Sequence, residues 1–186
     1  IEVVPVDVSN TRHAAVSPDG RYLAINDQGR GTPTVFFMDM VAGRSRSLVG
    51  TGTQGRTHTN FYMTFSPDGR HLALSLGDRL LTWNVSQLGG FGGGQAKEVK
   101  AIEGHLMPIN GISFSQDGRL LAMGGAAGTY SVWDTQTGSL FYKDVHHHWD
   151  YTAIQLFASG KMVAIGGSPQ WGISFVNLEN ENADFW

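Results

Sequence analysis

Apolar and polar residues alternate along short segments of this chain, and one such segment recurs four times. The four copies align without gaps on a single column of glycines, which are separated by 49, 49 and 42 residues: Gly20, Gly69, Gly118 and Gly160. In each copy an alternating apolar segment precedes the glycine and a short apolar segment follows it. Alternation with a period of two is typical of strands with one buried face. The pattern therefore predicts four repeat units built from strands.

The residues before the aligned glycine predict a tight turn between the first two strands of each unit. Asp19, Asp68 and Asp117 stand directly before the glycine in the first three units, and an Asp-Gly pair favours the positive backbone φ of a hairpin turn. The second strands are predicted at 22–25, 72–76, 120–123 and 162–165. The third strands end at 37–39, 82–84, 132–134 and 175–177, and more polar fourth strands are predicted at 44–49, 97–102 and 140–145.

Antiparallel four-stranded units that recur every 40 to 50 residues or so are typical of β-propeller blades. No segment of the sequence shows the apolar periodicity of an amphipathic helix. We therefore predict an all-β fold, a β-propeller of four-stranded antiparallel blades with about four blades visible, in a single complete or partial domain over 1–186. The blade units are placed at about 9–49, 57–102, 106–145 and 149–178, and residues 1–8 are added to the last of these units.

Segment 1–8 has the composition of a fourth strand, while the last unit ends soon after its third strand. The N-terminal strand is therefore expected to complete a blade, either with the C-terminal strands or with sequence beyond this chain. Sharing strands between the ends of a ring removes exposed sheet edges. The chain either closes as a four-bladed ring or forms part of a larger one, completed by further sequence or by a second copy, and the larger ring is favoured.

The third unit resembles a WD repeat, because Gly104-His105 opens it and Trp133-Asp134 closes its third strand. The first unit also resembles the blades of TolB-like and dipeptidyl-peptidase propellers through residues 17–25. The WD resemblance implies a buried hydrogen-bond network made by the opening His, a Ser or Thr of the second strand, a loop Asp and the Trp. Its expected members here are His105, Trp133, Trp83, Asp78 and His147, the last of which stands 13 residues before Gly160 as His105 does before Gly118.

Composition and charge exclude several classes of function. The 186 residues carry a formal net charge of −3 and no Cys. The charge therefore does not indicate binding to nucleic acid, and the chain has no thiol that could act as a nucleophile or metal ligand. No apolar run approaches the roughly 20 residues that cross a bilayer. We therefore expect no nucleic-acid or membrane partner. Localisation is unknown; we expect a soluble protein, with the cytoplasm slightly favoured.

Candidate chemistry is sparse. His146, His147 and His148 are consecutive, and neighbouring residues of a strand point to opposite faces, so they do not converge easily on one metal ion. The glycine-rich run 89–94 is not followed by Gly-Lys-Ser/Thr, and no Gly-x-Ser-x-Gly occurs. We therefore expect no enzyme, no metal and no cofactor.

Binding residues are expected on the propeller edge where second-to-third and fourth-to-first strand connections emerge. Trp149 and Trp171 fall in two such connections of one unit, although both could instead cover the rim of the core. Tryptophan, methionine and arginine are enriched in binding surfaces. The candidate partner-binding residues are Trp149, Trp171, His148, Met107, His58 and Arg12.

The resemblance to WD-repeat proteins implies a non-catalytic scaffold that binds a protein or peptide on this loop face. Two alternatives remain at the level of the sequence. One is a propeller appended to a peptidase, hydrolase or kinase as a substrate gate or sensor, which the first unit suggests. The other is a small-molecule or metal site in the channel. Self-association that completes a larger ring is a further possibility.

Overall fold

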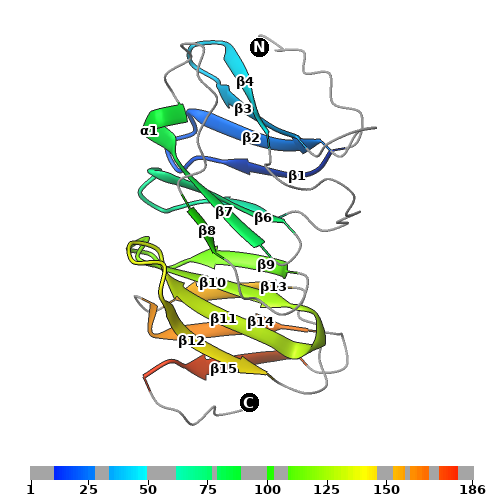
Figure 1. Cartoon of the computed structure of the whole chain (residues 1–186), viewed down its shortest axis with the longest axis vertical. Helices are drawn as coiled ribbons and strands as arrows, with labels where there is room; N and C mark the ends of the chain where they lie inside the picture. Colours follow the sequence, from blue (N-terminus) through cyan, green and yellow to red (C-terminus); the bar gives the residue numbers. More distant parts are fainter. Residues whose placement is uncertain are drawn as a thin grey trace.

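The structure is a computed structural model that describes residues 11–27, 34–49, 62–76, 79–88, 100–102, 109–145, 153–157, 160–167 and 172–179. Its secondary structure is almost entirely antiparallel strand, as the alternating pattern predicts. The chain has the all-β architecture of a propeller, with the sheets following one another along the chain (Figure 1). Segment 1–8, expected to be a strand, lies outside the described residues.

Three four-stranded sheets and one three-stranded sheet are seen in the described part of the chain. In every sheet the strands pair in chain order with their neighbours. The first sheet contains β1 (Thr11–Val16), β2 (Tyr22–Asp27), β3 (Thr34–Asp39) and β4 (Arg44–Val49). The second contains β5 (Met63–Phe65), β6 (His71–Leu76), β7 (Arg79–Asn84) and β8 (Lys100–Ile102). The third contains β9 (Ile109–Phe114), β10 (Leu120–Gly125), β11 (Thr129–Asp134) and β12 (Leu140–Val145), and the fourth contains β13 (Ala153–Phe157), β14 (Met162–Gly166) and β15 (Ile173–Asn177).

The predicted turns lie between the first two strands of each sheet. The four aligned glycines have φ values of 70°, 69°, 72° and 83°, a region that side chains other than glycine adopt only at a cost. The short helix α1 (Val85–Leu88) follows β7. The 3-10 turn η1 (Ala126–Gly128) connects β10 to β11.

Each sheet packs its face against the next one in chain order. The first sheet is at the top of Figure 1, and the third and fourth sheets overlap in its lower part. The first strands of the four sheets, β1, β5, β9 and β13, lie side by side, so that the sheets form a row. Each interface between sheets is apolar. The interface of the first and second sheets contains Phe37 and Trp83, that of the second and third contains Leu80 and Trp133, and that of the third and fourth contains Tyr130 and Val163.

A column of alanines stands on the second strands, four residues after each turn glycine. Ala24, Ala73 and Ala122 are fully buried against the following sheet. A residue this small lets the next sheet approach closely, while its larger neighbours fill the remaining space. We call the face of a sheet that turns toward the following sheet its forward face, and the opposite face its rear face.

Candidate functional site

The row has two edges with different connections. Because consecutive strands are antiparallel, the first-to-second and third-to-fourth strand turns emerge on one edge, which we call the turn edge. The second-to-third strand connections and the passages between sheets emerge on the other, which we call the loop edge. The sequence places the candidate binding residues on or next to the loop edge.

Most of the candidate residues lie outside the described part of the chain. This holds for five of the six partner-binding candidates, namely Trp149, Trp171, His148, Met107 and His58. Arg12 is placed by its backbone in β1. Of the predicted structural network, His105, Asp78 and His147 also lie outside, so Trp83 and Trp133 are the two members whose surroundings can be described.

Both tryptophans are buried in the structure. Trp83 is 2% exposed and Trp133 is 9% exposed. The indole Nε1–H of Trp133 donates to the Ser131 hydroxyl at 2.9 Å. Ser131 belongs to β11, the strand of Trp133 itself, whereas the resemblance implies a Ser or Thr of the second strand.

His13 links the first and second sheets near the loop edge. Its backbone N–H donates to Asn26 Oδ1 at 2.6 Å, and its Nδ1 accepts from the Met63 backbone N–H at 3.3 Å. Its ring also meets that of Tyr62 edge to face, with centroids 5.5 Å apart. Burial lowers the pKa of His13, which favours the neutral imidazole that can accept the Met63 bond. His13 is thus a structural residue here.

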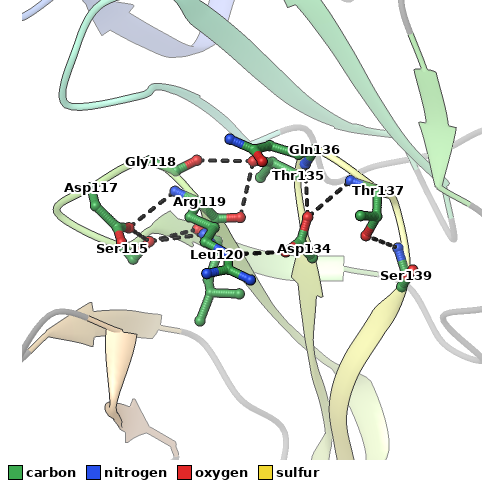
Figure 2. Close-up of polar contacts among 10 residues, drawn as sticks. All are labelled: Ser115, Asp117, Gly118, Arg119, Leu120, Asp134, Thr135, Gln136, Thr137 and Ser139. Carbon is green, nitrogen blue, oxygen red and sulfur yellow. Dashed lines mark hydrogen bonds and ion pairs between the residues drawn. The ribbon is translucent and has the colours of Figure 1, made fainter.

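The turn edge of the third sheet carries a polar network around the predicted hairpin (Figure 2). The Ser115 hydroxyl donates to Asp117 Oδ1 at 2.6 Å and accepts from the Leu120 backbone N–H at 2.9 Å. The same Asp117 oxygen accepts from the Arg119 N–H at 3.0 Å. The Ser-x-Asp-Gly-Arg sequence therefore satisfies its own backbone donors, which explains its recurrence in the first three units as a structural requirement.

Asp134 closes the neighbouring turn at the same edge. Its Oδ1 accepts from the backbone N–H groups of Gln136 and Thr137, both at 2.9 Å, and its Oδ2 accepts from Arg119 Nε at 3.1 Å (Figure 2). These bonds, led by the Thr137 N–H, lower the pKa of Asp134 to about 2. The aspartate that follows Trp133 is therefore a turn-forming residue that ties two hairpins together.

The pairing of a basic residue with an acid recurs along this edge. Arg21 Nη2 lies 2.8 Å from Asp39 Oδ2 in the first sheet, and the Arg21 hydrogen bonds lower the pKa of Asp39. In the fourth sheet Lys161 Nζ lies 2.9 Å from Glu179 Oε1. The second sheet has Asn84 at the equivalent position. A basic residue thus follows the turn glycine in each of the four described turns, and the pairings named here are made within single sheets.

We expect Asp134→Asn to lower the free energy of unfolding by about 1–2 kcal/mol at neutral pH, because the charged bond from Arg119 is lost. The pKa of Asp134 is lower in the folded state, so its contribution is complete above the ordinary value of 3.8 and disappears as the pH falls from there toward 2. Urea unfolding of both proteins at several pH values measures this. The reciprocal variant Asn84→Asp places a carboxylate near Arg70 and is expected to gain stability at neutral pH. A loss from Asp134→Asn that is equally large at pH 2 would contradict the charged interaction.

The described residues contain no cluster of three or more His, Asp or Glu able to hold a metal ion. In the same part of the chain no helix is long and apolar enough to cross a membrane. At the turn edge the carboxylates of Asp39, Asp117 and Asp134 are used in turns and ion pairs. The stacked sheets place their connections in two rows at opposite edges.

The sequence was sufficient to predict the turn residues, but two features of the structure were not predicted from it. The pairing of Arg119 with Asp134 was not predicted, although a basic residue follows the turn glycine in all four units. The recurrence of this basic residue was the sequence feature that could have indicated the pairing. The contact of His13 with Met63 was also not predicted, because nothing in the local sequence indicates the approach of Met63 from the next sheet.

Comparison with known proteins supports the propeller assignment. The WD40 family, described as WD domain, G-beta repeat, matches residues 96–134. This confirms the resemblance of the third unit to a WD repeat. No curated protein matches the chain. Among solved structures, that of U3-55K, a WD-repeat propeller protein, matches with a TM-score of 0.78 and 16% sequence identity over 100% of this chain. The chain spans 54% of the U3-55K chain, about half its length.

Proposed function

We propose that this chain is a non-catalytic scaffold that binds a protein or peptide at its loop edge. Propellers with WD40 repeats are typically protein-interaction scaffolds. The observation that carries the proposal is the WD40 repeat at 96–134, set in a row of four propeller-type sheets. Fold alone does not define a function, so the proposal also depends on which edge is available to a partner.

The described contacts favour the loop edge over the turn edge. At the turn edge the carboxylates of Asp39, Asp117 and Asp134 accept bonds from their own turns. A partner that recruited them would have to replace these bonds, which is unfavourable. The strands that flank Trp149 and Trp171 end at the loop edge. Both tryptophans offer large apolar area with few rotatable bonds, which is typical of the residues that dominate binding energy.

A display library of random linear peptides, selected on the purified chain, tests the proposal. We expect a selected peptide to lose about 30-fold in affinity with Trp149→Ala or Trp171→Ala, which corresponds to about 2 kcal/mol. Val41→Ala is the matched control, because Val41 is 80% exposed and lies at the turn edge. Unchanged binding by both tryptophan variants, together with a loss for Val41→Ala, would assign the binding surface to the turn edge instead.

A further inference from the structure

The arginine that follows the turn glycine has a different environment in the second sheet. In the first and third sheets this residue binds the aspartate that ends the third strand. Arg21 Nη2 lies 2.8 Å from Asp39 Oδ2, and Arg119 Nε lies 3.1 Å from Asp134 Oδ2 (Figure 2). Arg70 is the equivalent residue of the second sheet, and its side chain is 79% exposed. The comparison shows that the group which the repeat places against this arginine is a carboxylate.

Asn84 stands where the first and third sheets have the aspartate. It ends β7 as the aspartates end β3 and β11. In the part of the chain that the structure describes, the ion pair of Arg70 is with Asp68, at a long distance of 3.8 Å between Nε and Oδ2. The guanidinium of Arg70 therefore lacks the close carboxylate that its equivalents have.

The hydrogen bonds of Asn84 determine which atom of its amide replaces the aspartate Oδ2. Its Oδ1 accepts from the Ser86 backbone N–H at 3.0 Å and from the Ser86 hydroxyl at 2.6 Å. In the first sheet, Asp39 Oδ1 accepts from the Val41 N–H in the same way, and Oδ2 then accepts from Arg21. A backbone N–H can only donate, so the amide oxygen of Asn84 faces Ser86 and its Nδ2 takes the place of Oδ2.

Two donor groups therefore replace the donor and acceptor of the other sheets. An amide N–H2 and a guanidinium cannot bond to each other, and among the described residues neither Asn84 Nδ2 nor the Arg70 guanidinium has a close acceptor. Asn84 is held in this position by the helix that follows it, because Val85 and Leu88 of α1 are buried against the forward face of the first sheet. The two donors thus form a fixed corner at the turn edge.

The carboxylate of Asp68 leaves room for a second carboxylate at this corner. In the first sheet Arg21 contacts two acids at once, through its backbone N–H to Asp19 Oδ1 at 3.0 Å and through its guanidinium to Asp39. Asp68 is the equivalent of Asp19, one residue before the turn glycine. The position equivalent to Asp39 Oδ2 therefore stays open to an acceptor from outside the chain.

We propose that the corner formed by Arg70 and Asn84 binds the carboxylate of an aspartate or glutamate side chain of a protein partner. The carboxylate accepts from the guanidinium and from Asn84 Nδ2, and so occupies the place that an aspartate oxygen holds in the first and third sheets. The planar fork of N–H donors on arginine suits this geometry. The site lies on the second of four sheets, so it depends neither on what covers the end sheets nor on the loop-edge tryptophans.

Titration followed by nuclear magnetic resonance at low ionic strength tests the site. The probe is the peptide acetyl-Gly-Glu-Gly-amide, and the matching Gln peptide is its uncharged control. We expect the Arg70 Nε–H and Asn84 Nδ2–H2 signals to shift together with the Glu peptide, along one saturation curve with a dissociation constant of roughly 1–50 mM. The Gln peptide should leave both signals unchanged.

Variants that remove the site should lose this response. Arg70→Gln is expected to abolish the shift of the Asn84 signal. Arg44→Gln is the matched control, because Arg44 is also exposed and begins β4 at the turn edge, and it should leave that shift unchanged. Asn84→Asp supplies a carboxylate from within the sheet and is expected to weaken binding of the Glu peptide roughly threefold or more. The expected gain in its stability shows that the loss does not come from unfolding.

A variant of the third sheet should acquire the same site. Asp134→Asn places an amide beside Arg119 and reproduces the arrangement of the second sheet. We expect the Glu peptide to shift the Arg119 Nε–H signal in this variant and to leave it unchanged in the parent chain. This gain cannot be explained by a change in the net charge of the second sheet.

Four results would overturn the proposal. The Glu peptide could cause no shift at Arg70 and Asn84, or the Gln peptide could cause the same shifts. The response of Asn84 could persist in Arg70→Gln. A phosphoserine peptide of the same length could bind roughly tenfold more tightly than the Glu peptide, which would assign the corner to phosphate groups.

Discussion

Replacing Trp83 with alanine is expected to lower the free energy of unfolding by about 3–5 kcal/mol. Trp83 is 2% exposed and pairs across the sheet with Leu72. It belongs to the cluster in which Phe37 of the first sheet meets the second sheet. Its truncation removes a large apolar surface and leaves a cavity at that interface. A domain of this size is stable by about 5–15 kcal/mol in total, so the loss is a large fraction.

Urea unfolding followed by circular dichroism measures the effect of Trp83→Ala. Phe141→Ala is the matched control, because it also truncates an aromatic side chain on a strand but at a position that is 54% exposed. Its effect should stay within about 0.5 kcal/mol. A loss below about 1 kcal/mol for Trp83→Ala would mean that the first and second sheets are not held together through this side chain.

Gly160→Ala is expected to cost about 2–4 kcal/mol, through two separate causes. The backbone φ of Gly160 is 83°, and a side chain in the left-handed region costs about 1 kcal/mol. The added Cβ would also lie 3.0 Å from Leu120 Cδ1 and 3.3 Å from Ser115 Cβ of the third sheet. Crowding of this kind in a packed interface typically costs about 1–3 kcal/mol more.

The matched control for Gly160→Ala is Gly20→Ala. Gly20 has a φ of 70° and nothing within 4 Å of a built Cβ, so its substitution carries the backbone cost of about 1 kcal/mol alone. Both are measured by urea unfolding. The double variant Gly160→Ala/Leu120→Ala should lose less stability than the sum of the two single variants, because the contacting methyl group is gone. Equal effects of the two glycine substitutions would contradict the close packing of the fourth sheet on the third.

Much of the fold could be predicted because each repeat unit contains the strand and turn residues that determine its own local structure. The fourth strands predicted at 44–49 and 140–145 agree with the structure, and the second strands differ by one or two residues at their ends. The helix α1 was not predicted, since four residues are too few to show a helical period. Asn84, which precedes it, accepts a bond from the Ser86 N–H at 3.0 Å, but asparagine is as common in turns as before helices.

The functional site was harder to predict than the fold for a physical reason. Strand and turn preferences depend on neighbouring residues, whereas an interaction surface depends on which segments meet in space. The bond between His13 and Met63 joins residues 50 positions apart, and no pattern within one unit encodes it. Val16 and Phe175 are exposed although their equivalents in other sheets are buried, and no local pattern indicates this difference.

The alanine column has a consequence for how such a chain can change in length. Ala24, Ala73, Ala122 and Ala164 occupy the same place in the four units. Because the smallest side chain stands at the point of closest approach, a unit fits behind any other that keeps it. Duplication or loss of one whole unit would therefore keep this small residue at the contact between neighbouring sheets, whereas insertion of a single strand would displace it.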